Sequence, residues 1–312
     1  MVSQLSDFGD PKLHEQLKYF TYKPVNIAPE VALGVYTIVG LILVWQMVRF
    51  KSQRWVGILP GTAFAEALGY VFRTLCVYNT TFTMYVLMTL FLLVPVNALA
   101  LANYKAVGKI MRNSNATPRR FWLKPAFVNW FYFASDLFSI AMQGAGGGML
   151  VNANTKNVGR ALVMIGLIVQ LFFFACYLAT TIYVWRRPVY TVDLGVNDTS
   201  HAQAKNRVMR CVTITTVILY LRSIYRIAEF ADGYGGKIYS CEWAFYVFDT
   251  ILIFLAFVVY IVLFVGKNFT RGPKMERAPS VAGSVQMPQP QFGFNQNQMP
   301  GSEQYLVNKE HV

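Results

Sequence analysis

The chain has 312 residues, of which 55% are hydrophobic and only 14% are charged, and its formal net charge is +13. Ordinary soluble domains are about 25% charged. A soluble protein of this size could not bury so much apolar surface. The composition therefore predicts an integral membrane protein and excludes a wholly disordered chain, a collagen-like fibre and a disulfide-rich secreted module.

Seven stretches are long and apolar enough to cross the hydrocarbon core of a bilayer, which takes about 20 residues. In chain order they are 30–48, 55–77, 82–103, 126–148, 159–185, 208–231 and 242–265. The residues before them, 1–28, are polar and lack the apolar core of a signal peptide, so the first span is expected to direct insertion. The predicted fold class is all-α, a bundle of seven transmembrane helices over residues 30–265.

Lysine and arginine gather in alternate connections. The connections after the first, third and fifth spans hold three, six and five of them, whereas the other connections hold only Lys156 and Lys237, with Arg160 at an edge. Positively charged loops stay in the cytoplasm, so 1–29 is predicted to be extracellular. The C-terminal residues 266–312, rich in Pro, Gln, Asn and Gly, are predicted to be a disordered cytoplasmic tail. The basic loops are expected to contact anionic lipids, not nucleic acid.

Several kinds of chemistry have no residues to support them. The only histidines, His14, His201 and His311, lie outside the spans, so neither a haem nor a metal site is expected. There is no GxxxxGK[ST] loop for ATP and no convincing nucleophile–base set. We therefore predict no cofactor and no enzyme activity. Cys76 and Cys241 fall at the outer ends of the second and seventh spans, where they either form a disulfide or remain two separate thiols.

Ionisable residues inside the spans are the most informative feature. An ionised side chain at the centre of a bilayer costs about 2.5–3.5 kcal/mol on insertion scales, so seven facing lipid would cost on the order of 20 kcal/mol. They are expected to face inward, to pair or to line water. The seven are Glu66, Arg73, Asp136, Arg222, Arg226, Glu229 and Asp249, and Glu242 lies at the outer rim.

The spacing of these residues places each group on one face of its helix. We expect the four faces to converge on one hydrophilic region that opens to the outer leaflet. Two interpretations remain open, a pathway for substrate or protons and a set of ion pairs that only hold the helices together. The groups are Glu66, Tyr70 and Arg73; Asp136, Ser139 and Gln143; Arg222, Arg226 and Glu229; and Glu242 and Asp249.

Four motifs in order resemble the fungal RTA-like family of lipid-translocating exporters over about residues 20–268. They are Tyr22, Pro24 and Asn26; Glu66-Ala-Leu-Gly-Tyr-Val-Phe-Arg73; Asp136 with Gln143-Gly-Ala-Gly-Gly-Gly148; and Arg222-Ser-Ile-Tyr-Arg226 with Glu229, Gly233, Glu242, Tyr246 and Asp249. The chain departs from the family pattern after Asp249, where Thr250-Ile-Leu-Ile replaces an expected proline. The sequence therefore gives no support for a proline kink in the seventh helix.

The resemblance implies a seven-helix fungal protein of the plasma membrane. It further implies release or flopping of sphingoid long-chain bases, or resistance to aminocholesterols and other toxic amphiphiles. On this hypothesis the cationic amine of a long-chain base pairs with Glu66, Asp136 or Asp249, and the arginines hold the acids apart. The alternative is a seven-helix receptor or lipid-stress sensor without transport activity.

Overall fold

A computed structural model describes residues 27–78, 81–114, 124–150, 154–187, 198–232, 236 and 241–268. Six long helices come first, and the last helix is built from three segments. The long helices are α2 (Ile27–Arg49), α3 (Ile58–Tyr78), α4 (Phe82–Asn113), α5 (Pro125–Met149), α6 (Lys156–Arg186) and α7 (Asp198–Asp232). The last helix comprises α8 (Glu242–Phe245), the π-helical η5 (Tyr246–Ile251) and α9 (Leu252–Val262). Short 3₁₀ turns, η2 (Arg54–Gly57) and η6 (Val265–Asn268), precede α3 and follow α9.

The described residues contain helices and no strands, as the sequence predicted. Six helices of the described residues are long and apolar enough to cross a membrane. α5 is one further long helix, at the position of the fourth predicted span. Of the predicted extracellular segment 1–29, residues 1–26 lie outside the described part of the chain. Its last three residues belong to α2, which begins at Ile27. The predicted tail lies outside them from residue 269.

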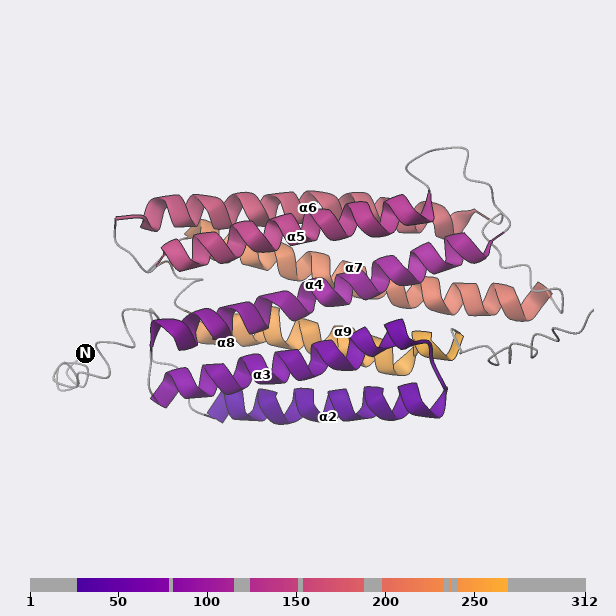
Figure 1. The fold of residues 1–312 in the computed structure, drawn as a ribbon, viewed down its shortest axis with the longest axis horizontal. Helices are drawn as coiled ribbons and strands as arrows, with labels where there is room; N and C mark the ends of the chain where they lie inside the picture. Colours follow the sequence, from indigo (N-terminus) through magenta and orange to yellow (C-terminus); the bar gives the residue numbers. More distant parts are fainter. Residues whose placement is uncertain are drawn as a thin grey trace, which may run out of the picture. The chain divides into compact units, whose positions relative to one another are not determined.

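α4 is the central helix of the bundle. It packs against α3, α5 and α7, and Figure 1 shows it running between the α2–α3 pair and the α5–α6 pair. Pro95 lies inside α4 without ending it. Helices α3, α5 and α7 therefore share α4 as a common neighbour.

Two helices are longer than predicted. α4 continues to Asn113 and α7 starts at Asp198, each about ten residues beyond the predicted apolar span. In the extension of α4, Tyr104, Val107 and Met111 are buried, while the intervening Lys105 is partly exposed. A hydropathy window ends where such charges begin, although the amphipathic helix itself continues.

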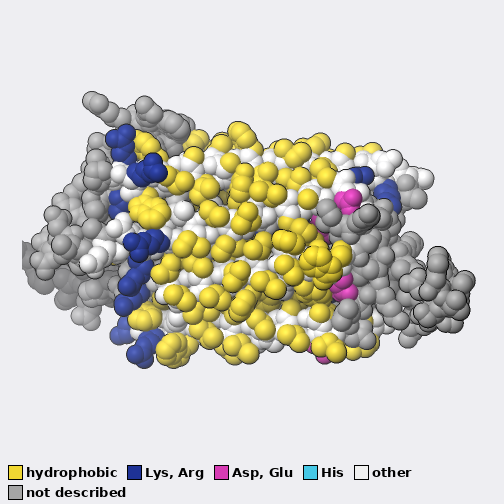
Figure 2. Space-filling model, turned by 180° about the vertical axis from the view of Figure 1, so that it is seen from behind, with side chains coloured by type: hydrophobic (Ala, Val, Ile, Leu, Met, Phe, Trp, Pro, Cys, Tyr) yellow, Lys and Arg dark blue, Asp and Glu magenta, His cyan; other side chains and the backbone are white. Residues whose placement is uncertain are grey.

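The outer surface of the described bundle is a belt of apolar side chains. Figure 2 shows this belt, with Lys and Arg gathered along one end of it and Asp and Glu near the other. The large exposed side chains include Ile38, Trp45, Trp130, Phe172 and Val262. An apolar surface of this extent on a soluble protein would cause aggregation, whereas in a bilayer it faces the acyl chains.

The last helix is irregular beside Asp249 although it has no proline there. The π-helical turn η5 spans Tyr246–Ile251, and such turns leave backbone groups that need other partners. Tyr36 Oη donates to the Thr250 carbonyl at 2.7 Å, and the hydroxyls of Tyr70 and Thr250 lie 2.7 Å apart. The rings of Tyr36 and Tyr70 are stacked. Helices α2 and α3 therefore contact the irregular turn at the carbonyl and the hydroxyl of Thr250.

Two glycines bring α5 and α6 into close contact. A Cβ atom on Gly146 would lie 2.5 Å from the carbonyl oxygen of Gly159, and one on Gly159 would lie 2.7 Å from the carbonyl oxygen of Gly146. Real Cβ contacts are not so short. Small residues allow helix backbones to approach in this way in membranes.

Candidate functional site

An ion-pair network joins α7 to the last helix. The carboxylate of Asp249 is fully buried and lies 2.6 Å from Arg222 Nε. Arg226 donates to the same carboxylate through Nε at 3.0 Å and Nη2 at 2.9 Å. Arg226 Nη1 also donates to Glu229 at 3.1 Å. Two consecutive turns of α7 therefore present both guanidiniums to the π-helical turn, as their i, i+4 spacing predicts.

Arg73 of α3 joins the other side of this network. Its Nη2 lies 3.5 Å from Glu242, and its Nε donates to Tyr246 Oη at 3.2 Å. The guanidinium carbons of Arg73 and Arg226 lie 4.3 and 5.4 Å from the centre of the Phe245 ring. An aromatic ring attracts cations at this range, so Phe245 helps to hold two like charges beside one another.

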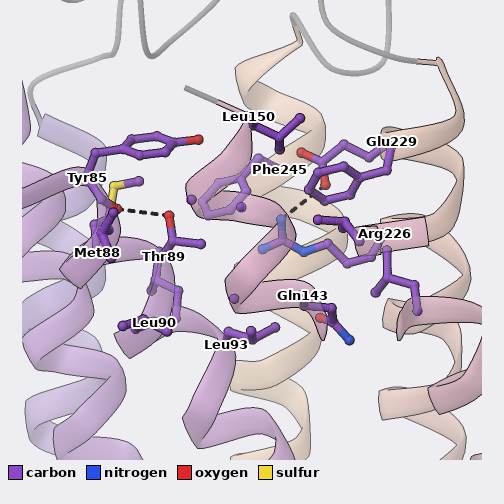
Figure 3. Close-up of a pocket in the computed structure, with 18 of the residues that line it drawn as sticks. Tyr85, Met88, Thr89, Leu90, Leu93, Gln143, Leu150, Arg226, Glu229 and Phe245 are labelled. Atoms are coloured by element: carbon purple, nitrogen blue, oxygen red, sulfur yellow. Dashed lines mark hydrogen bonds and ion pairs between the residues drawn. The ribbon is translucent and has the colours of Figure 1, made fainter. Parts of the chain in front are cut away.

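A cavity of about 140 Å³ adjoins the network. Arg73, Gln143, Arg226 and Glu229 form its polar wall, beside Phe245. Figure 3 shows Arg226 and Glu229 facing α4 across this space. Most of the remaining lining is apolar, with Val86, Met88, Leu90, Leu92 and Leu93 of α4 and also Leu150, Val163, Leu167 and Phe230. A cavity with one charged wall and one apolar wall suits an amphiphile.

Glycines of α5 keep part of the cavity wall free of side chains. Gly144, Gly147 and Gly148 all line the cavity. A Cβ atom added to Gly147 or Gly148 would meet nothing within 4 Å, and one on Gly144 would meet only Leu90, at 3.8 Å. These positions have room for a side chain, so the glycines make the cavity larger than any other residue would.

Next to the cavity, starting from Gln143 in its wall, amide side chains link three helices. Gln143 of α5 donates to Gln170 of α6 at 2.8 Å, and Gln170 donates to Asn97 of α4 at 2.9 Å. Asn97 donates in turn to the Leu93 carbonyl within α4. Interhelical hydrogen bonds of this kind fix neighbouring helices in membranes. Gln143, one of the predicted pathway residues, therefore has a structural contact as well as a place in the cavity wall.

The predicted pathway residues occupy different depths. Arg73, Gln143, Arg226 and Glu229 line the cavity, and Glu242 contacts it through Arg73. Arg222 and Asp249 do not line the cavity, and Asp249 connects Arg222 to Arg226. Tyr70 does not line it either, and its hydroxyl contacts that of Thr250. Glu66 is fully buried, and neither of its carboxyl oxygens has a hydrogen-bond partner among the described residues.

Asp136 lies apart from the other predicted site residues. Its Oδ2 accepts a hydrogen bond from Tyr104 Oη at 2.8 Å, and the Tyr104 ring packs against Tyr132 and Tyr177. None of these residues lines the cavity. The shared face of Asp136 and Gln143 was correctly expected to turn inward, but the two residues lie two helical turns apart and meet different neighbours.

The cysteines form no disulfide. Cys76 is buried and Cys241 is half-buried, and both are thiols, as are Cys176 and Cys211. Of the two alternatives left open by the sequence, the structure therefore has the separate thiols.

The sequence did not single out some residues that line the cavity. Phe245 and the α4 residues Tyr85, Met88 and Thr89 are the clearest examples. Their residue types are also those of ordinary packing or lipid-facing positions. The sequence offered one signal for Phe245: it precedes Tyr246, which is one of the residues that carry the family resemblance.

The fold and the site together define a multi-pass helical membrane protein with a polar, ion-paired interior. The family profile described as "RTA1 like protein" matches residues 60–272, which is most of the bundle. The chain therefore belongs to the RTA1-like family, and the resemblance seen in the motifs is confirmed.

Several curated relatives come from Saccharomyces cerevisiae. The chain is 30% identical to "Protoporphyrin uptake protein 1" over 62% of its own length and 63% of that protein. It is 29% identical to "Protein RTM1", with 66% of each chain covered, so the match spans a little under two thirds of these first relatives. It is 22% identical to "Sphingoid long-chain base transporter RSB1" over 78% of this chain and 74% of that one. No solved structure matches.

Proposed function

We propose that this protein moves amphiphilic lipids, such as sphingoid long-chain bases or sterol-like toxic amphiphiles, across the membrane. The observation that carries the proposal is the cavity, with guanidiniums and a carboxylate on one side and apolar side chains of α4 on the other. Its relatives include one named as a sphingoid long-chain base transporter. An amphiphile would place its polar headgroup among the charges and its chain against the apolar wall.

Glu229 is the acid best placed to meet a cationic headgroup. Its side chain is 11% exposed and lines the cavity, whereas Asp249 is 0% exposed and already lies between two arginines. Asp136 lies in its own tyrosine cluster. Among the acids considered from the sequence, this geometry favours Glu229 over Glu66, Asp136 and Asp249 as the partner of an amine. Arg226 would keep Glu229 oriented toward the cavity.

We further propose that the end of the bundle with most of the Lys and Arg faces the cytoplasm, with the N-terminus outside. Figure 2 shows this basic border beside the apolar belt, and anionic lipids of the inner leaflet would attract it. The cavity lies toward the opposite end of the helices, near the start of α4 and the end of α5. It would then open toward the outer leaflet of the plasma membrane.

The test is a reconstitution of the purified protein into liposomes with a fluorescent sphingoid base. The readout is the rate at which the lipid becomes accessible to a quencher outside. Gly147→Leu places a side chain in the cavity without a clash at its Cβ, and Gly61→Leu is the matched control, because a Cβ at exposed Gly61 also meets nothing within 4 Å.

We expect Gly147→Leu to lower the rate toward that of protein-free liposomes and Gly61→Leu to keep the wild-type rate. Equal rates in the two variants would contradict transport through this cavity. A wild-type protein that moves no lipid, yet binds it, would instead support the receptor or sensor alternative.

A further inference from the structure

Glu66 differs from the other acids near the cavity. Glu229, Glu242 and Asp249 each lie 3.5 Å or less from an arginine nitrogen. Glu66 makes no such pair within the described residues, and both of its carboxyl oxygens are buried and without a hydrogen-bond partner there. A buried polar group without a partner is costly and needs an explanation.

The neighbouring side chains do little to offset the cost of burying the Glu66 carboxyl group. Tyr70 lies one helical turn further along α3 and its ring stacks on that of Tyr36 of α2, but the hydroxyls of both tyrosines are engaged with Thr250. Asp249 precedes Thr250 in η5, so the charged groups on this side of α3 are Asp249 and the two arginines of α7 that bind it, Arg222 and Arg226. Both arginines lie on the Asp249 carboxylate.

A count of charges gives the same result. Among the described residues, the ion-pair network taken together with Glu66 contains three arginines, Arg73, Arg222 and Arg226, and four acids, Glu66, Glu229, Glu242 and Asp249. Fully ionised, it has one negative charge in excess. An uncompensated charge in a low-dielectric interior is expensive, so one monovalent cation would balance the network.

We propose that this cation is a proton on Glu66, and that it is exchanged for a cationic headgroup bound in the cavity. When the headgroup settles beside Glu229, the network gains one positive charge; the proton leaves a Glu66 carboxyl oxygen for water, and the total charge is unchanged. The contacts that link the two sites are Glu229 to Arg226, Arg226 to Asp249, and Asp249 to Arg222. The exchange rests on the proposed function, whereas the proton on Glu66 does not.

The exchange is measured by calorimetric titration of the nanodisc-embedded protein in buffers of different ionisation enthalpy. The probe is dodecyltrimethylammonium below its micelle-forming concentration, because its permanent charge cannot release a proton. We expect release of about one proton per bound cation from the wild type. Glu66→Gln should release none, and it should bind the probe more weakly than the wild type, because no proton can leave to balance the added charge. The control Glu30→Gln changes an exposed glutamate in the first turn of α2 and should release as much as the wild type.

A second variant tests the charge count away from Glu66. Glu242→Gln removes one acid at the rim, which leaves three acids and three arginines, so it should also release no proton. Binding by the wild type without proton release would overturn the proposal, and so would undiminished release from Glu66→Gln. Competition between the probe and sodium ions would overturn it too, since sodium would then be the balancing cation.

Infrared spectroscopy provides a measurement without ligand. Wild type should show a carboxylic-acid C=O band that Glu66→Gln lacks and Glu30→Gln keeps. If the band is unchanged in Glu66→Gln, the proton is not on Glu66 and the proposal fails. If the band disappears as expected but the probe does not bind, Glu66 holds the proton, and the cationic headgroup site of the proposed function is wrong.

Discussion

Arg226 is the side chain through which the stability of the ion-pair network is best measured. It makes three hydrogen bonds of 2.9–3.1 Å, two to the fully buried Asp249 and one to Glu229. Arg226→Gln removes the charge and leaves Asp249 with Arg222 as its remaining ionic partner. Removing one partner of a buried ion pair costs about 3–5 kcal/mol. We expect Arg226→Gln to lower the free energy of unfolding by this amount, with a fall in Tm on the order of 10 °C.

The assay is thermal unfolding of purified protein in detergent, followed by the loss of the monodisperse peak in size-exclusion chromatography. Arg210→Gln makes the same chemical change on an exposed position of α7, and surface substitutions usually stay within about 0.5 kcal/mol. A Tm for Arg226→Gln within a degree or two of that for Arg210→Gln would refute the argument that the network stabilises the bundle.

Two further predictions concern packing and orientation. Gly146→Ala places a Cβ 2.5 Å from the Gly159 carbonyl oxygen and should lower the free energy of unfolding by about 1–3 kcal/mol. Gly147→Ala meets nothing within 4 Å and should leave the stability unchanged or slightly higher. Equal Tm values of the two variants in thermal unfolding would contradict the close packing of α5 and α6. With the native cysteines replaced by alanine, Lys51→Cys at the basic end of α2 should react with a membrane-impermeant maleimide only after cells are permeabilised, and Glu30→Cys at the other end should react in intact cells. The reverse pattern would invert the proposed orientation.

The sequence alone was sufficient for the helices and for the direction in which most charges face. Apolar stretches of about 20 residues can satisfy their backbone in a bilayer only as helices, and charged residues such as Arg222 and Arg226 must turn away from lipid. The 3.6-residue period then placed both on one face of α7. These arguments need no knowledge of neighbouring helices.

The tertiary structure decided which of those inward-facing groups meet. Helical periodicity fixes the face of a residue on its own helix but not the rotation, depth or partner of that helix in the bundle. Asp136 and Glu66 looked equivalent in the sequence, yet Asp136 accepts a hydrogen bond from Tyr104, whereas Glu66 has no such partner among the described residues. The apolar wall from α4 and the space beside Gly147 likewise arise only when the helices pack together, because a cavity is a property of several surfaces and not of any one of them.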